Sequence, residues 1–231
     1  MEMSFYDIMN HLRKNAGMFQ EHLFKGTSNP QEGAETYILQ VVVTRGLQGS
    51  GKSLWSKLLS RHPFRHNNTS DWYPWVRICK DDLRQMMGEY WVKPREQYID
   101  SCVKSMIYGA LMEGYCVVFD GLGMNDHVLA MVRQACMDAA KDMWMLHNTR
   151  TKVELFYKDF GMDVDECIRN DKTGSEGGWR RYIGEEVILG TAEKYKDVVA
   201  TLRPVSSAPY EVCNWSYYRG NETLDGITWE D

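Results

Sequence analysis

The feature that most constrains this fold is an apolar run that leads directly into a glycine-rich loop. Residues 37–43 read YILQVVV, a nearly continuous apolar stretch rich in β-branched side chains, which is typical of a parallel strand covered on both faces. Residues 46–53 read GLQGSGKS and fit the pattern G-x-x-x-x-G-K-S. Between a strand and a helix, the backbone N–H groups of such a loop surround phosphate oxygens. We therefore predict a nucleoside triphosphate site directly after the first strand.

Each residue type in this loop has a separate part in holding phosphate. The glycines let the backbone approach the phosphates closely, and the N-terminal end of the next helix adds partial positive charge. Lys52 is expected to reach the β- and γ-phosphates and the Ser53 hydroxyl to ligate Mg²⁺, so we predict ATP and Mg²⁺ as cofactors. The residues predicted to bind ATP in the loop are Gly46, Gln48, Gly49, Ser50, Gly51, Lys52, Ser53 and Leu54.

Strand-like and helix-like segments alternate along the rest of the chain. Short apolar runs predict further strands at residues 75–79, 115–120, 152–157 and 210–215. Apolar residues at helical spacing predict helices from the loop to about residue 59 and over residues 95–113, 126–140, 163–170 and 184–202. This alternation is typical of a doubly wound, parallel α/β sheet with flanking helices. The polar, glycine-rich residues 171–181 predict a mobile lid between two of the helices.

The chain of 231 residues is long enough to bury one sizeable core. Residues 1–36 carry a loose helical pattern and then a linker rich in Gly, Ser, Asn and Pro. We expect this part to be an N-terminal helical extension and residues 37–231 to form the main domain.

A second polar motif follows the second predicted strand. Residues 78–87 read ICKDDLRQMM and contain Asp81, Asp82 and Arg84. Ligands of open α/β sheets bind outside the carboxyl ends of the strands. An acidic residue there can accept the proton of an attacking hydroxyl, and an arginine one helical turn later can neutralise charge on a phosphoryl group. The alternative interpretation is that the aspartates cap a helix and that the arginine is solvated.

A third motif is Asp120, which ends the apolar strand predicted at residues 115–120. A carboxylate at this place, near a phosphate loop, can hold Mg²⁺ opposite Ser53. Asn125, in the following loop, can reach the same crevice. The alternative for both residues is that they cap the next helix.

Composition narrows the classes of function. The net charge of −5 argues against a surface that binds nucleic acid nonspecifically, but it does not exclude a local basic groove. The six cysteines form no C-x-x-C pair, so we expect reduced thiols rather than zinc or disulfides. The N-terminus does not read as a signal peptide, and no apolar run approaches the ~20 residues of a membrane-spanning helix. These features predict a cytoplasmic protein with no membrane partner.

Taken together, the motifs resemble the kinase domain of the bacteriophage polynucleotide 5′-hydroxyl kinases and their relatives. The shared pattern runs from GLQGSGKS through ICKDDLR and VVFD to CIRN and covers residues 38–195. The resemblance implies a P-loop kinase domain at residues 37–231 and, if a phage encodes the chain, a location in the host cytoplasm. It implies Asp81 as general base, with Arg84 and Lys52 as further catalytic residues. The remaining residues it implies are Ser53 and Asp120 for the metal and Arg169 for ATP.

The chain also departs from the pattern of these kinases. They commonly have Thr-Asn after the strand-ending aspartate, whereas this chain has Gly121 and Leu122. Their lid usually supplies an arginine shortly after the R-N pair, whereas Thr173 stands at about this place. The candidates for that role are Arg169, Lys172, Arg180 and Arg181. No phosphatase motif D-x-D-x-T/V follows. The chain is therefore also compatible with a resemblance to the relatives that phosphorylate 5-hydroxymethyluracil in DNA.

The resulting hypothesis is an ATP- and Mg²⁺-dependent kinase that acts on a hydroxyl of a nucleic acid, with DNA favoured over RNA. The acceptor is either a polynucleotide 5′-hydroxyl or a 5-hydroxymethyluracil base in phage DNA. Aromatic side chains near the predicted base can stack nucleobases, although aromatic residues beside a strand commonly belong to the core; they are Trp72, Tyr73, Trp75, Tyr90 and Trp91. One alternative is a kinase for a mononucleotide or another small molecule, which the acidic charge favours. Another is a non-catalytic nucleotide switch, and the oligomeric state is left open.

Overall fold

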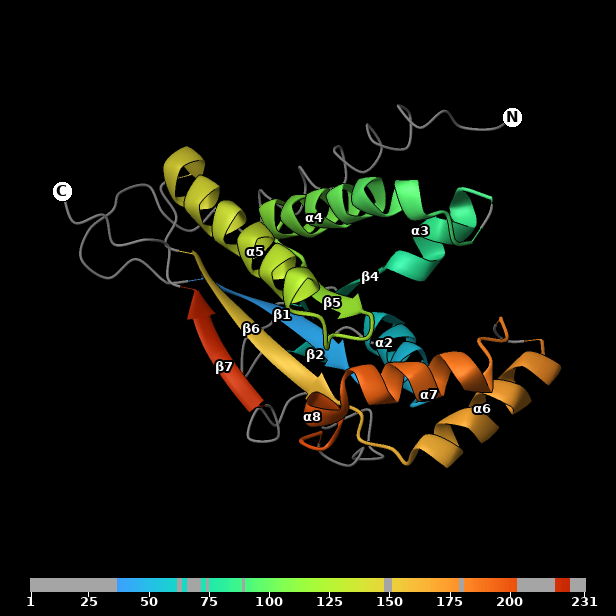
Figure 1. Cartoon of the computed structure of the whole chain (residues 1–231). Helices are drawn as coiled ribbons and strands as arrows, with labels where there is room; N and C mark the ends of the chain where they lie inside the picture. The colour runs from blue at the N-terminus through green and yellow to red at the C-terminus, as the bar shows by residue number, and fades with distance from the viewer. Residues whose placement is uncertain are drawn as a thin grey trace.

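A five-stranded sheet lies at the centre of the fold (Figure 1). The computed structural model describes residues 37–61, 64–65, 72–73, 75–88, 90–147, 151–178, 181–202 and 219–224. The strands of the sheet follow the order β4-β5-β1-β6-β7, with bounds Trp75–Cys79 (β4), Cys116–Asp120 (β5), Tyr37–Arg45 (β1), Thr151–Asp159 (β6) and Arg219–Leu224 (β7). The first four are parallel, and β7 pairs antiparallel with β6. A separate antiparallel pair consists of β2 (Phe64–Arg65) and β3 (Trp72–Tyr73).

The central strands and the helices expected from the glycine-rich loop to about residue 59 and over residues 95–113 lie within a few residues of the bounds expected from sequence, whereas the helices expected over residues 126–140 and 163–170 end six or seven residues later than expected. The helices are α2 (Lys52–Arg61), α3 (Lys80–Met86), α4 (Glu96–Met112), α5 (Asp126–His147), α6 (Val164–Glu176), α7 (Glu185–Lys194) and α8 (Lys196–Val199), with a 3₁₀ turn η1 (Lys93–Arg95) before α4. Residues 1–36 and the strand predicted at 210–215 lie outside the described residues.

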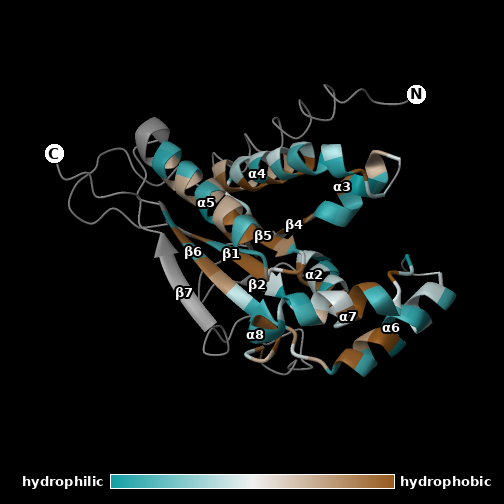
Figure 2. Ribbon diagram, viewed as in Figure 1, coloured by the Kyte–Doolittle hydropathy of each residue, from teal (hydrophilic) through white to brown (hydrophobic). Residues whose placement is uncertain are grey.

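The side chains of β1 alternate between the two faces of the sheet, as the period of a strand requires. Val41 and Val43 pack on one face with buried residues of α4 and α5, including Ile107 and Val132. Val42 points to the other face, where the buried residues include Trp55 and Leu59 of α2. The strand is thus covered on both sides, which explains its continuous apolar sequence. In Figure 2 much of β1, β5 and the middle of β6 is hydrophobic, whereas α4 and α5 alternate between hydrophilic and hydrophobic residues.

A third apolar cluster lies beyond the carboxyl ends of the strands. Its fully or nearly buried members are Leu47, Met124, Cys167 and Ile188. They come from the loop after β1, the loop after β5, α6 and α7, so this cluster fixes the two C-terminal helices over the first glycine-rich loop. In Figure 1, α6 and α7 form an antiparallel pair at this end of the sheet.

The end of the helix expected over residues 163–170 was wrong, because α6 continues into the polar segment 171–181 as far as Glu176; the mobility predicted for this segment stays a prediction. The carboxylate of Asp171 in this helix is buried, and its Oδ2 accepts hydrogen bonds from the backbone N–H groups of Ile183 and Gly184, each at 3.0 Å. This contact satisfies two donors at the start of α7 and ties that helix to α6. The helix expected over residues 184–202 is divided at Tyr195 into α7 and α8.

The strand order also determines which polar motifs are neighbours. β5 lies between β1 and β4, so that Asp120 at the end of β5 is directly beside the loop after β1. The residues that follow β4, including Asp81, are one strand farther away.

Among the helices of the described residues, none is long and apolar enough to cross a membrane.

Candidate active site

The loop after β1 has a backbone that two of its glycines make possible. Gly49 has a φ of +83° and Gly51 a φ of +93°, a region that other residues rarely adopt. A Cβ built on Gly49 would lie 2.1 Å from the carbonyl oxygen of Cys167 in α6, whereas one built on Gly51 would meet nothing within 4 Å. Gly49 therefore permits the close contact with α6, and Gly51 keeps the outer side of the loop open.

Lys52 is buried at the start of α2, and its ammonium group lies against the loop itself. Nζ donates hydrogen bonds to the backbone carbonyl of Leu47 and to Oγ of Ser50, the latter at 3.3 Å. A positive charge is thus held at the N-terminus of a helix, beside backbone N–H groups. This combination of charge and dipole suits a phosphate group.

Side chains from α6 and α7 hold the same loop from the other side. Nδ2 of Asn170 donates to the backbone carbonyl of Gly49 at 3.2 Å, and Nε2 of Gln48 donates to Oγ1 of Thr191 at 3.3 Å. The Gln48 side chain is therefore directed at α7, and Leu54 is 67% exposed on α2. A nucleotide contact by Gln48 rests on its backbone rather than on its side chain.

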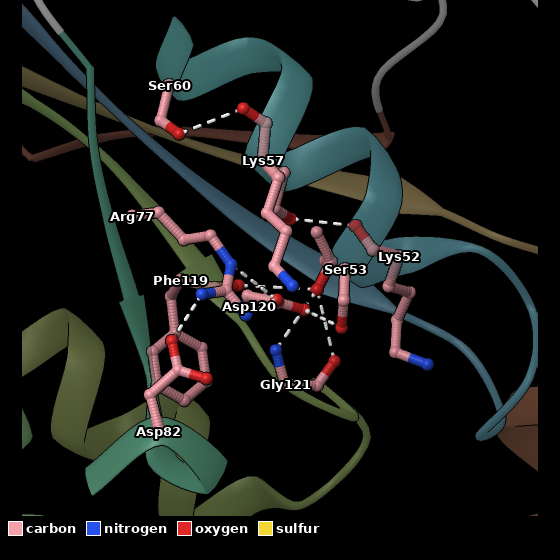
Figure 3. A network of polar contacts seen from close by, with 11 residues as sticks. Lys52, Ser53, Lys57, Ser60, Arg77, Asp82, Phe119, Asp120 and Gly121 are labelled. Carbon is pink, nitrogen blue, oxygen red and sulfur yellow. Dashed lines mark hydrogen bonds and ion pairs between the residues drawn. The ribbon is translucent and has the colours of Figure 1, made fainter. Parts of the chain in front are cut away.

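Ser53 and Asp120, predicted from separate motifs, lie side by side (Figure 3). The Ser53 hydroxyl donates to Oδ1 of Asp120 at 3.2 Å, and the side chain of Asp120 is only 2% exposed. Hydroxyl and carboxylate oxygens are the ligands that Mg²⁺ prefers, and it commonly takes one or two protein ligands together with substrate phosphates. The residues present therefore fit the expected Mg²⁺ site.

Arg77, which the sequence interpretation missed, is the second partner of Asp120. Its Nε and Nη2 lie 2.8 and 2.6 Å from Oδ2 of Asp120, and its Nη1 pairs with Asp82. Burial would lower the pKa of Arg77, but the charge of Asp120 and the hydrogen bonds to both carboxylates raise it overall. The available signal was a single charge in the strand WVRIC, whose other side chains are apolar.

The two aspartates of the DD-x-R motif pair with different arginines. Asp82 faces Arg77, whereas Asp81 accepts a hydrogen bond from Nη1 of Arg84. The same guanidinium is held by Glu96 of α4, with Nε to Oε1 at 2.9 Å and Nη2 to Oε2 at 2.6 Å. This two-point pairing fixes the plane of the arginine. Sequence reasoning did not identify Glu96, because an acidic residue in the first turn of a helix is common for electrostatic reasons alone.

Aromatic side chains surround the Arg84 guanidinium. Its central carbon lies 5.0 Å from the ring centre of Trp91 and 5.8 Å from that of Tyr90, while Arg181 approaches Tyr90 at 4.2 Å. Burial, together with the charge of and hydrogen bond to Asp81, raises the pKa of Tyr90. Trp91 is 61% exposed, so much of its ring remains accessible to solvent.

The other aromatic candidates do not share this position. Trp75 is buried in the apolar cluster under α2 and is a core residue. The side chains of Trp72 and Tyr73 lie outside the described part of the structure.

The remaining predicted side chains have separate locations. Arg169 and Lys172 are exposed on α6, Arg181 contacts Tyr90, and Arg180 lies outside the described residues. Oδ1 of Asn125 accepts a hydrogen bond from the backbone N–H of His127 at 2.9 Å. Asn125 therefore caps α5, which was the alternative interpretation for this residue.

Gly121 and Leu122, which replace the Thr-Asn pair of the resembled kinases, connect the two loops through their backbones. The Thr44 hydroxyl donates to the carbonyl of Gly121 at 3.1 Å and accepts from its N–H at 3.2 Å. The backbone N–H of Gly46 donates to the carbonyl of Leu122 at 3.0 Å. These contacts hold the end of β5 against the end of β1.

Comparison with solved structures shows a similarity of the overall fold. The structure is similar to a chain of the Pnkp1/Rnl/Hen1 RNA repair complex, with a TM-score of 0.53 and 19% identity over 81% of this chain and 53% of that chain. The two chains share an α/β fold in which helices flank a sheet that is parallel over four of its strands. The predicted fold class is thereby confirmed, and the chain spans about half the length of its counterpart in the repair complex.

Other solved structures have lower TM-scores, and we draw no conclusion from them. A gluconokinase from Sinorhizobium meliloti 1021 has a TM-score of 0.41 and 13% identity over 79% of this chain and 91% of that chain. A second structure of the Pnkp1/Rnl/Hen1 complex has a TM-score of 0.44 and 20% identity over 60% of this chain and 41% of that chain. No protein-family model and no curated protein sequence matches the chain.

The contact between the loop and α6 can be tested with two glycine substitutions. Gly49→Ala places a Cβ 2.1 Å from a backbone oxygen of α6, so we expect it to lower the free energy of unfolding by about 3 kcal/mol or more. Gly51→Ala meets the same unfavourable φ but no neighbouring atom, so about 1–2 kcal/mol is expected. Chemical denaturation of the two variants measures the difference, and equal losses would contradict the packing described here.

Proposed function

We propose that this protein is an ATP- and Mg²⁺-dependent kinase that transfers the γ-phosphate of ATP to a hydroxyl of a nucleic acid. The observation that carries the proposal is that three polar groups follow the carboxyl ends of the neighbouring strands β1, β5 and β4. They are Lys52 with its loop, Ser53 with Asp120, and Asp81 with Arg84. The first two suit the phosphate donor, and the third suits the acceptor.

The donor half is built from the loop and the start of α2. Backbone N–H groups of the loop, from Gly49 to Ser53, would bind the β- and γ-phosphates, and Lys52 would neutralise their charge. Ser53 and Asp120 would hold Mg²⁺, which when bound offsets charge on the transferring phosphoryl group. Arg169, exposed on the helix that contacts the loop, remains our proposed contribution of α6 to ATP binding.

The acceptor half depends on Asp81. Its carboxylate is 49% exposed and is held on one side by Arg84, which leaves it accessible to an acceptor hydroxyl. Asp81 would accept the hydroxyl proton and orient the oxygen toward the γ-phosphate. Glu96 fixes Arg84, whose further N–H donors would contact the phosphoryl group during transfer.

A nucleic acid as acceptor is supported by the aromatic and cationic side chains next to this base. Trp91 offers an exposed ring, and Arg84 and Arg181 bring positive charge to the same place. Nucleobases stack on aromatic rings and phosphates pair with arginine. The similarity to a chain of an RNA repair complex points in the same direction. We favour DNA from the resemblance to phage kinases, with a 5′-hydroxyl or a 5-hydroxymethyluracil base as the reacting group.

The second candidate is a kinase for a mononucleotide or another small molecule. The net charge of −5 favours it, because a polymer-binding surface usually has an excess of positive charge. The salt dependence of acceptor binding distinguishes the two candidate functions. Binding of a polyanion releases counterions, so its affinity falls as the salt concentration rises. A KM for the acceptor that is independent of salt would support the small-molecule kinase.

The assignment of the general base predicts different outcomes for two adjacent aspartates. Asp81→Asn should lower transfer by about 10²–10⁴-fold, because the amide cannot accept the hydroxyl proton, while ATP affinity stays within a few-fold of wild type. Asp82→Asn should retain far more transfer, because Asp82 faces Arg77. The measurement is transfer of label from γ-labelled ATP at saturating Mg²⁺. Equal losses in the two variants, or full transfer by Asp81→Asn, would refute the assignment.

Stacking on Trp91 predicts a loss that depends on the acceptor. Trp91→Ala should raise the KM for a base-bearing acceptor by about 5–100-fold, since stacking contributes about 1–3 kcal/mol per base, and Trp91→Phe should raise it less. An acceptor with an abasic sugar at the reacting end serves as the control, because its KM should not respond to the substitution. If Trp91→Ala impairs both acceptors equally, the ring acts through Arg84 and not through stacking.

A further inference from the structure

Arg77 lies between two carboxylates that belong to the two halves of the site. Its guanidinium contacts Asp120 through Nε and Nη2 and contacts Asp82 through Nη1 (Figure 3). Asp120 ends β5 beside the phosphate loop, and Asp82 stands in the first turn of α3, next to Asp81. One cation is therefore shared between the expected metal ligand and the acceptor-side helix.

The two oxygens of Asp120 have different partners. Oδ1 accepts the hydrogen bond from Ser53, while Oδ2 takes both contacts from Arg77 at 2.8 and 2.6 Å. The side chains are 2% exposed for Asp120 and 12% for Arg77, so water contributes little to their solvation. A buried carboxylate of this kind requires a cation close by.

Asp82 gives Arg77 a second partner of a different character. Its side chain is 54% exposed, and the pair that it forms with Arg77 is in contact with solvent. Such a pair is weak on its own, but it prevents the arginine charge from being left unpaired if the contact with Asp120 is lost. Because Nη1 already contacts Asp82, the change of partner requires only that Nε and Nη2 leave Asp120.

We propose that Arg77 is an exchangeable internal cation that neutralises Asp120 until the metal of a metal–nucleotide complex takes its place, and that it then remains paired with Asp82. Arg77 is thus a positioning residue that sets the affinity of the site for the divalent metal. The inference rests on the proposed function, because it assumes that Ser53 and Asp120 hold the metal of the nucleotide.

Arg77 and the metal compete for the carboxylate of Asp120, and this competition determines whether a substitution raises or lowers the affinity for the metal. In Arg77→Met, the buried charge of Asp120 has lost its internal partner, so the metal binds more tightly. In Asp82→Asn, Arg77 has only Asp120 left, so the metal binds more weakly. A residue that merely supports the fold would lower stability without moving the metal affinity in opposite directions.

The experiment measures the Mg²⁺ concentration that gives half-maximal binding of a fluorescent ADP analogue, without any turnover. Arg77→Met should lower it by about tenfold, because one buried charge–charge interaction is removed. Asp82→Asn should raise it by about 2–5-fold, as expected of an exposed pair. Arg77→Lys keeps a cation at this place and should lie between wild type and Arg77→Met.

The possible results separate the failure of this inference from failure of the proposed function. If the wild type binds the analogue in an Mg²⁺-dependent way and both variants share its midpoint, or shift in one direction, Arg77 is not an exchangeable cation. If the wild type shows no Mg²⁺-dependent binding, and Lys52→Met binds equally, the proposed nucleotide site itself is wrong. Thermal unfolding monitors the folding of Arg77→Met. Should that variant fail to fold, the midpoints of Asp82→Asn and Arg77→Lys decide the matter, because an unchanged or lowered midpoint in Asp82→Asn contradicts the inference.

Discussion

The hydrogen bond from Ser53 to Asp120 is the contact on which the rest of the proposed site depends. It joins the first turn of α2 to the end of β5, and it forms because β5 pairs directly with β1. The pairing is held by apolar side chains on both faces of the sheet and by Thr44, which bonds the loop after β5. A buried carboxylate and a hydroxyl are thereby placed beside the N-terminus of a helix. The helix dipole favours a phosphate there, and the two oxygens suit the metal that a phosphate brings. Every other part of the site is arranged around this position.

The pairing of charges then divides the site into two halves that share a boundary. Arg77 connects Asp120 to Asp82, and Arg84 connects Asp81 to Glu96. Each arginine is paired with two carboxylates. The adjacent aspartates therefore have different surroundings, although the sequence presents them as equivalent. Among the residues that the structure describes, Asp81 has Tyr90 and Arg84 as neighbours, whereas Asp82 pairs with Arg77.

Much of this fold could be predicted from sequence, because local signals coincide with burial. The run 37–43 is apolar since β1 is covered on both faces, and 75–79 was predicted with the bounds that β4 has. Ser53 and Asp120 could be paired in advance because parallel strands bring their carboxyl ends to one edge. Contacts between side chains far apart in sequence could not. Glu96 resembles an ordinary first-turn acid, Arg77 is one charge in a strand, and the link between α6 and the start of α7 depends on the hydrogen bonds that Asp171 accepts from residues 183 and 184.

We propose that the loop after β1 and the Asp81–Arg84 pair form one site for phosphoryl transfer to a nucleic acid. The most direct measurement offers γ-labelled ATP and Mg²⁺ to 5′-hydroxyl DNA and RNA oligonucleotides, to duplex DNA containing 5-hydroxymethyluracil, and to nucleoside monophosphates. This account predicts Mg²⁺-dependent label in at least one of the polymers, with little in the monophosphates. Label confined to the monophosphates, or no transfer to any acceptor while ATP still binds, would contradict it.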